Sequence, residues 1–139
     1  QETLDKTTLL VGHNIKFDLV WLLESGFKYE GRLYDTMIAE YVLLRGMRKA
    51  LSLKEICKRR SIAQKSDAVD DYMKQKISFE NIPIDIIEEY GRQDVISTRA
   101  LFDSQIADFK KLILMCQDLM KLRYYLKKSL ALSHSVSST

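Results

Sequence analysis

Two carboxylates and a phenol occupy positions in this sequence that suit catalysis. Asp18 follows a phenylalanine at the point where an apolar helical segment begins. Asp94 stands four residues after Tyr90, and this spacing places both side chains on one face of a helix, one turn apart. Hard divalent cations require oxygen ligands, mainly carboxylates, and a tyrosine beside such a carboxylate can orient a water molecule. The three residues therefore fit part of a two-metal site for phosphodiester hydrolysis.

Each of these residues also has a structural explanation. Asp18 could be an ordinary first-turn acid that the helix dipole stabilises. Asp94 could be a solvated acid, Tyr90 a half-buried core residue, and Asn14 a turn residue. Only their combination favours catalysis, and two carboxylates are too few for a complete two-metal site.

Alternating strands and helices must position these side chains. Gly26 suits the end of a helix, Asp35 suits an N-cap, and Ser52 with Glu55 forms a capping box. Pro83 is favoured in the first turn of a helix. The patterns predict a strand at residues 9–11 that is buried on both faces, a helix at 17–25, a strand at 28–34, and helices at 36–45, at 53–60 and from Pro83 onward.

The last predicted helix is long and uninterrupted. Asp94 lies on the shoulder of its predicted buried stripe. We expect residues 61–82 to be mostly irregular, with a possible short helix at 68–75, and the serine-rich tail at 133–139 to be disordered. The predicted stripe comprises Ile84, Ile87, Gly91, Val95, Thr98, Phe102, Ile106, Phe109 and Ile113.

The sequence predicts a soluble protein of one ordinary domain. Its 139 residues suffice for a sizeable core. Its opening residues are polar and acidic, unlike a secretory signal, and no apolar run approaches the ~20 residues of a membrane span. Cys57 and Cys116 lack metal-type spacing and fall in helical patterns, so both are predicted to be buried thiols in a reducing compartment.

Basic residues are concentrated in one part of the chain, although the net charge is only +3. Residues 45–65 carry eight basic side chains and one acidic side chain, between two acidic stretches. This basic block is either a solvated helix face, with Lys and Arg near its C-terminal end, or a surface that follows a phosphate backbone.

Two segments carry a resemblance to a known family. The segment VGHNIKFDLVWLL resembles the second exonuclease motif, and YGRQDV the third, of the DEDDy group of 3′-5′ exonucleases. The intervening YDTMIAEYVLL, followed by LSLKEI, resembles the proofreading domain of family A, polymerase I-like and phage-type DNA polymerases. The resemblance covers about residues 8–107. We expect residues 1–107 to form the C-terminal part of the exonuclease domain, and residues 108–139 a helical extension with a disordered serine-rich tail.

The resemblance implies a role for each matching residue. Asp18 and Asp94 would bind two ions of Mg²⁺ or Mn²⁺, and Tyr90 would hold the attacking water. Asp35 would be structural. The residues implied to contact the terminal nucleotide of a single-stranded DNA 3′ end are Asn14, Lys16, Phe17 and His13; for His13 we favour a strand-end hydrogen bond. A polymerase domain in the same chain and a cytoplasmic setting in a bacterial or phage-infected cell are also implied.

The resemblance is incomplete at both ends. The family's Asp-x-Glu motif supplies the other metal ligands, and nothing in residues 1–17 fits it. Because the first methionine is Met37, we expect a fragment whose motif and first strands lie upstream of Gln1. The chain alone should then bind metal weakly and show little or no activity. Residues 126–139 match no polymerase segment.

The expected fold is therefore α/β, the C-terminal portion of a ribonuclease H-like fold with two short strands, helices and a long C-terminal helix. Three alternatives remain. One is an exoribonuclease resembling ribonuclease D, which shares the Asp, Asp and Tyr pattern. Another is a non-catalytic module that binds nucleic acid or a partner through the basic block. The last is a helical interaction domain whose acids are all solvated.

Overall fold

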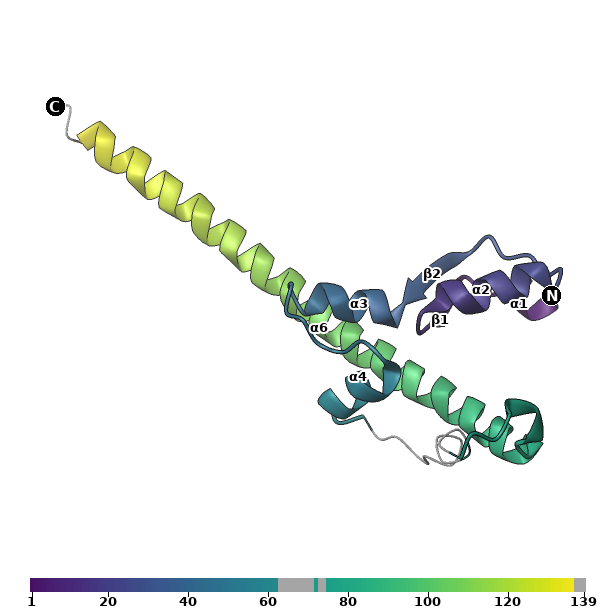
Figure 1. Ribbon diagram of the computed structural model, residues 1–139. Coiled ribbons are helices and arrows are strands. Elements are labelled where there is room, and N and C mark those ends of the chain that lie inside the picture. Colours follow the sequence, from purple (N-terminus) through teal and green to yellow (C-terminus); the bar gives the residue numbers. More distant parts are fainter. Residues whose placement is uncertain (63–71, 73–74, 137–139) are drawn as a thin grey trace. The chain divides into compact units, whose positions relative to one another are not determined.

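A mixed set of helices and strands forms the computed structural model, which describes residues 1–62, 72 and 75–136 (Figure 1). The chain divides into two compact units, Gln1–Gln105 and Ile106–Thr139. In chain order the elements are α1 (Glu2–Asp5), β1 (Leu9–Gly12), α2 (Ile15–Glu24), β2 (Arg32–Asp35), α3 (Thr36–Leu43), α4 (Leu53–Arg59), the 3₁₀ turn η1 (Phe79–Asn81) and α6 (Ile84–Val136).

The two strands pair in parallel, because α2 carries the chain from the end of β1 back to the start of β2. Leu9 pairs with Arg32 and Gly12 with Asp35, so both strands end at the same edge. This confirms a mixed α/β chain with two short strands. The predicted burial of β1 on both faces is wrong, since all four of its residues are only half-buried. Within the described residues the sheet has only these two strands, so β1 has one neighbour.

Local signals in the sequence set the helix ends. Asp35 caps α3 by accepting from two backbone N–H groups, and Ser52 caps α4 by accepting from Glu55 N–H at 3.4 Å. Gly26 follows α2 with φ of +85°, the left-handed conformation predicted for its stop. Differences are small: α2 begins two residues early, at Ile15, β2 begins at Arg32 instead of residue 28, and α3 ends at Leu43 instead of residue 45.

The core of the first unit lies between α3, α4 and α6, and polar residues share it. Figure 1 shows α3 beside α6, and hydrogen bonds from Gln105 join the two helices. Fully or nearly buried side chains are Ile15, Ala39, Leu44, Ile56, Cys57, Ile82 and Leu101 among the apolar residues, and Thr36, Glu40, Ser97 and Gln105 among the polar ones.

The buried face of α6 differs from the predicted stripe. Ser97, Leu101 and Gln105 are buried, one position before the predicted Thr98, Phe102 and Ile106, which are half-buried. The prediction is wrong at Gly91, Val95, Ile84 and Ile113, which are exposed. Hydrogen bonds of Gln105 to α3 set the rotation of α6, and a count of apolar residues could not anticipate them.

The two cysteines have different environments. Cys57 is buried in α4, as predicted, whereas Cys116 is exposed and its predicted burial is wrong. Cys116 belongs to the second unit, in which the described residues are one helix with no second element to cover it.

Some predictions fall on residues that the structure leaves undescribed. These include most of the possible helix at 68–75 and the last three residues of the serine-rich tail. The tail residues Ser133–Val136, for which disorder is predicted, belong to α6. Over the described part of the chain, no helix combines the length and apolar character of a membrane span.

Candidate functional site

The predicted nucleotide-contacting residues follow the carboxyl end of β1. The chain leaves β1 at Gly12, turns at Asn14 and enters the first turn of α2, which carries Phe17 and Asp18. Asn14 and Asp18 are exposed, and 66% of Phe17 is exposed. Ligand sites of parallel sheets lie beyond the carboxyl ends of the strands. These side chains are therefore placed where a substrate could reach them.

The turn between β1 and α2 is tight because the side chain of Ile15, the first residue of α2, packs closely against Gly12. A Cβ atom on Gly12 would lie 2.9 Å from Cγ1 of Ile15, the one buried residue of α2. Any larger residue at position 12 would push the first turn of α2 away from the strand end. Gly12 thus contributes to the site by allowing this close approach.

His13 is held within the protein through both ring nitrogens. Nε2 donates to the carbonyl oxygen of Leu51, because a carbonyl can only accept, and Nδ1 lies 2.9 Å from Oγ1 of Thr36. The Thr36 hydroxyl also lies 3.2 Å from the carbonyl of Gly12, and its single proton can be donated either to that carbonyl or to Nδ1 of His13. This bonding agrees with the strand-end role that we favoured from the sequence, and it joins the start of α3 to the turn.

Tyr90 and Asp94 lie on α6, in the part that belongs to the first unit. Tyr90 is 41% exposed and Asp94 is half-buried, so both are partly accessible. Further along α6, Phe102 packs edge-to-face on Tyr34 with ring centroids 4.8 Å apart, and Gln105 donates to Thr36. These contacts attach α6 to the strand and helix that border the turn.

The described residues do not form a complete metal site. Among the described residues no three His, Cys, Asp or Glu side chains lie close enough to hold an ion. Asp18 and Asp94 have the correct donor chemistry for Mg²⁺ or Mn²⁺, but they stand on separate helices and need further oxygen ligands. Their combination into one site stays a prediction.

A buried ion-pair network joins α3, α4 and α6. The Glu40 carboxylate is only 3% exposed and accepts from Arg59 at 3.0 Å, Arg60 at 2.8 Å and Gln105 at 3.0 Å. Burial alone would raise the pKa of Glu40. The hydrogen bonds from Gln105 and Arg59 and the charge of Arg60 outweigh burial and hold this pKa below its ordinary value. The carboxylate therefore stays ionised.

Tyr34 lies at the edge of this network. Its hydroxyl donates to Oε1 of Gln105 at 3.4 Å. Burial raises the pKa of the Tyr34 phenol, and the charge of Arg60 opposes part of this increase. The phenol is thus neutral and can donate.

A family model described as a 3′-5′ exonuclease of the DNA polymerase A family matches residues 2–105. The chain belongs to this family. Comparisons with curated proteins and with solved structures give no significant match. The resemblance inferred from the two motifs is confirmed, and the domain is of a hydrolase type that acts on nucleic acids.

Sequence reasoning missed the polar residues that hold this exonuclease domain together. Glu40 was not singled out, although it lies four residues from both Thr36 and Leu44, which are buried. That i, i+4 row was the available signal. Gln105 offered no signal, since its partners are distant in sequence.

The basic block is divided in the exonuclease domain. Arg59 and Arg60 form ion pairs with Glu40, so their guanidinium groups are not both available to bind a phosphate backbone at the surface. Arg45, Arg48 and Lys49 are exposed in the loop between α3 and α4, which we call the basic loop (residues 45–51). The carbonyl of Leu51, at the end of the basic loop, bonds to His13 beside the turn at Asn14.

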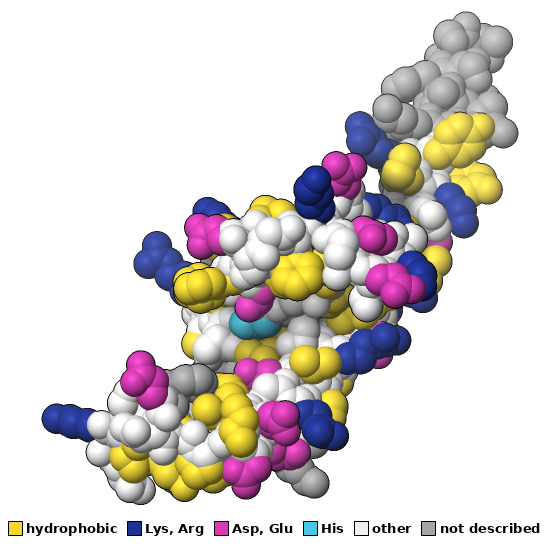
Figure 2. All heavy atoms as spheres, turned by 90° about the vertical axis from the view of Figure 1, so that its right-hand side faces the viewer, with side chains coloured by type: hydrophobic (Ala, Val, Ile, Leu, Met, Phe, Trp, Pro, Cys, Tyr) yellow, Lys and Arg dark blue, Asp and Glu magenta, His cyan; other side chains and the backbone are white. Residues whose placement is uncertain are grey.

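On the face shown in Figure 2, hydrophobic side chains lie among acidic and basic ones.

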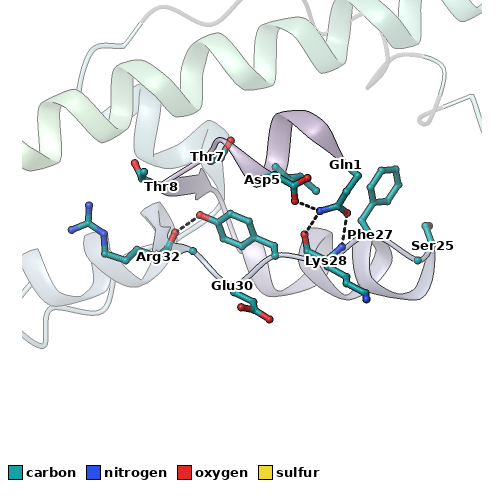
Figure 3. A pocket seen from close by; sticks show the side chains of 13 residues that line it. Gln1, Asp5, Thr7, Thr8, Ser25, Phe27, Lys28, Glu30 and Arg32 are labelled. Atoms are coloured by element: carbon teal, nitrogen blue, oxygen red, sulfur yellow. Dashed lines mark hydrogen bonds between the residues drawn. The ribbon is translucent and has the colours of Figure 1, made fainter.

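A pocket lies at the opposite ends of the strands, where β1 and β2 begin (Figure 3). The Gln1 side chain donates to the carbonyl of Lys28 and to Asp5, and Lys28 N–H donates back to Gln1. Tyr29 donates to the carbonyl of Arg32. None of the predicted site residues lines this pocket. It is therefore distinct from the candidate exonuclease site.

Proposed function

We propose that this chain supplies the catalytic part of a 3′-5′ exonuclease that removes terminal nucleotides from DNA, with a proofreading role beside a polymerase domain. The match of residues 2–105 to the exonuclease family carries this proposal. It is supported by the exposed turn at Asn14, which lies beyond the carboxyl ends of β1 and β2. We propose residues 1–107 as the exonuclease part and 108–139 as a helical extension.

The proposed roles follow from side-chain chemistry and position. Asn14, with Lys16 and Phe17, would hold the terminal nucleotide: the amide by hydrogen bonds, the cation by its charge and the aromatic ring by stacking. Tyr90 would orient a water molecule for attack on the terminal phosphodiester. His13, through its hydrogen bonds to Thr36 and Leu51, would hold the turn that carries Asn14 and so help to position the nucleotide. The water oxygen bonds to phosphorus as the bond from phosphorus to the 3′ oxygen of the preceding nucleotide breaks. The terminal nucleotide leaves as a 5′-monophosphate, and the protons of the water are shared between the new 3′-hydroxyl and solvent.

Asp18 and Asp94 are the proposed ligands of Mg²⁺ or Mn²⁺. When bound, these ions would lower the barrier to hydrolysis by stabilising negative charge on the phosphate oxygens. The described residues provide only part of a ligand set. We propose that an Asp-x-Glu pair preceding Gln1, which the family resemblance implies, provides the rest.

A nuclease assay on the full-length protein tests this function. A 5′-labelled single-stranded DNA should shorten one nucleotide at a time with Mg²⁺ and stay intact with EDTA. The same oligonucleotide made of RNA distinguishes the ribonuclease D-like alternative, for which RNA would be shortened faster. Endonucleolytic fragments, or shortening from the 5′ end, would contradict the proposal.

One observation also favours a binding role for the basic loop: its bond to His13 places it next to the turn at Asn14. Changing Arg48 and Lys49 to Gln should weaken binding of single-stranded DNA and reduce the slope of log K against log salt by about 1.4, since each phosphate contact contributes about 0.7. Fluorescence anisotropy over a salt series measures this slope.

The matched control changes Lys28 and Arg32 to Gln. These exposed cations border the pocket at the opposite ends of the strands, so the slope should not change. Equal slopes for the two double variants would show that the basic loop makes no phosphate contacts. Tight binding by a protein that never cleaves would favour the non-catalytic module.

A further inference from the structure

The Asp35 carboxylate accepts more hydrogen bonds than the capping of α3 requires. Its Oδ1 accepts from the N–H groups of Met37 at 2.8 Å and Ile38 at 3.4 Å, an ordinary N-cap arrangement. Oδ1 also accepts from Asn14 N–H at 3.1 Å, and Oδ2 accepts from Ile15 N–H at 3.2 Å. The last two bonds leave α3 and cross to the turn that precedes α2.

The backbone of the turn is left-handed at Asn14. Asn14 has φ of 55° and ψ of 45°, a conformation that asparagine adopts more readily than other residues with a side chain, but less freely than glycine. Its own side chain makes no capping hydrogen bond to α2. The N-terminus of α2 therefore takes its acceptor from Asp35, and the Asn14 amide is not used for capping.

The backbone of the turn decides where the proposed substrate-contacting side chains stand. The conformation of Asn14 sets the direction of its own side chain, and the start of α2 sets the positions of Phe17 and Asp18, two and three residues after Ile15. In the described residues Asp35 is the side chain that bonds to the backbone N–H groups of both Asn14 and Ile15. Its loss would release the turn without removing any proposed substrate contact.

We propose that Asp35 is a positioning residue of the exonuclease site, whose carboxylate fixes the turn at Asn14 and so orients Asn14 and the first turn of α2 toward the nucleotide end. This inference rests on the proposed function. The competing explanation is that Asp35 serves only as the N-cap of α3. The bonds to Asn14 and Ile15 separate the two explanations, because a residue that only caps α3 needs neither.

The variant Asp35→Ser tests the proposal. Serine is as good an N-cap as aspartate, so α3 keeps its cap, but the single shorter hydroxyl cannot also bond to the turn. Hydrogen exchange at the Asn14 and Ile15 amides should become about tenfold faster, as expected when a hydrogen bond to a charged group is lost. In the full-length protein, kcat on single-stranded DNA should fall about 10- to 100-fold, because a small misplacement of reacting groups is costly.

Two further variants guard against a folding artefact. Asp35→Asn keeps the capping oxygen but presents an amide nitrogen to Ile15 N–H, so it should lie between wild type and Asp35→Ser in both measurements. Ser52→Ala removes the N-cap of α4, which makes no bond to the turn, and should change kcat less than about twofold. Circular dichroism checks that each variant keeps its helices.

The outcomes are decisive for each proposal. A normal kcat in Asp35→Ser, despite faster exchange at Asn14 and Ile15, would show that the turn needs no support and would overturn the positioning role. Unchanged exchange would overturn it as well. A wild-type protein that shortens no nucleic acid would overturn the proposed function. In that case, weaker oligonucleotide binding by Asp35→Ser than by wild type would still support the positioning role. Equal binding by the two proteins would overturn it.

Discussion

Replacing Glu40 by alanine is expected to lower the free energy of unfolding of this chain by about 3 kcal/mol, near the low end of the range for breaking a buried ion pair. The substitution leaves Arg59 and Arg60 without their carboxylate and removes an acceptor of Gln105. The loss stays near the low end because the Arg59 side chain is 28% exposed, so water can solvate its guanidinium in the variant. Urea unfolding followed by far-UV circular dichroism, which reports the loss of the helices, measures the change.

Two control variants distinguish the network from a general charge effect. Glu30→Gln removes an exposed carboxylate from the same unit and should change stability by less than about 0.5 kcal/mol. The double variant Glu40→Met with Arg60→Met should lose less stability than the sum of the losses in the two single variants. Each single change leaves one buried charge without its partner, whereas the double change removes both charges. Additive effects would show that the two side chains do not interact.

The same network predicts how stability depends on pH. The pKa of Glu40 is lower in the folded state than in the unfolded chain, so its contribution is fully present above the unfolded value of about 4.3. It is lost as pH falls through the folded pKa. Glu40→Gln should therefore flatten the acid side of the stability curve while leaving the difference from wild type constant between about pH 6 and 8.

Local signals predicted the elements of this fold well. The N-cap at Asp35, the N-cap at Ser52, the stop at Gly26 and the start of α6 after Pro83 each depend on residues within one or two turns of chain. Such interactions are short in sequence and leave a readable pattern. The same holds for the segment from Asn14 to Asp18, whose motif indicates the family.

Long-range polar contacts explain what the sequence could not predict. Gln105 reaches residues 65 and 69 positions away, and these bonds choose the face of α6 that is buried. Sequence spacing had placed Val95 in the core, yet it is 71% exposed. Asp35 was predicted as a cap of its own helix, but its bonds to Asn14 and Ile15 depend on the strand register that pairs Gly12 with Asp35.

The register and the network together connect the two halves of the proposed site. Asp35 fixes the turn that leads to Asp18, and α3 begins at the next residue. The same helix carries Thr36 and Glu40, which hold α6 through Gln105. Because α6 carries Asp94, one short helix links the elements that bear both carboxylates. The site thus depends on α3 although none of its residues is a proposed ligand.

Changing Asp94 to Asn in the full-length protein is expected to reduce the rate of 3′-5′ cleavage by about 10²- to 10³-fold. Asparagine keeps the shape of the side chain but removes the charge that we propose binds the metal, and loss of several kcal/mol of transition-state stabilisation gives a factor of this size. Release of nucleotides from a labelled oligonucleotide, measured over a range of Mg²⁺ concentrations, reports both the rate and the metal requirement.

The matched control is Asp103→Asn on the same helix. Asp103 is exposed and pairs with Arg99 at 3.0 Å, a surface contact of little energetic weight, so its loss should change the rate less than about twofold. Single-stranded DNA should still bind to Asp94→Asn, since the nucleotide contacts are proposed at Asn14 and Phe17. If Asp94→Asn cleaves as fast as Asp103→Asn, the metal does not depend on this carboxylate, and the assignment of α6 to the catalytic site is wrong.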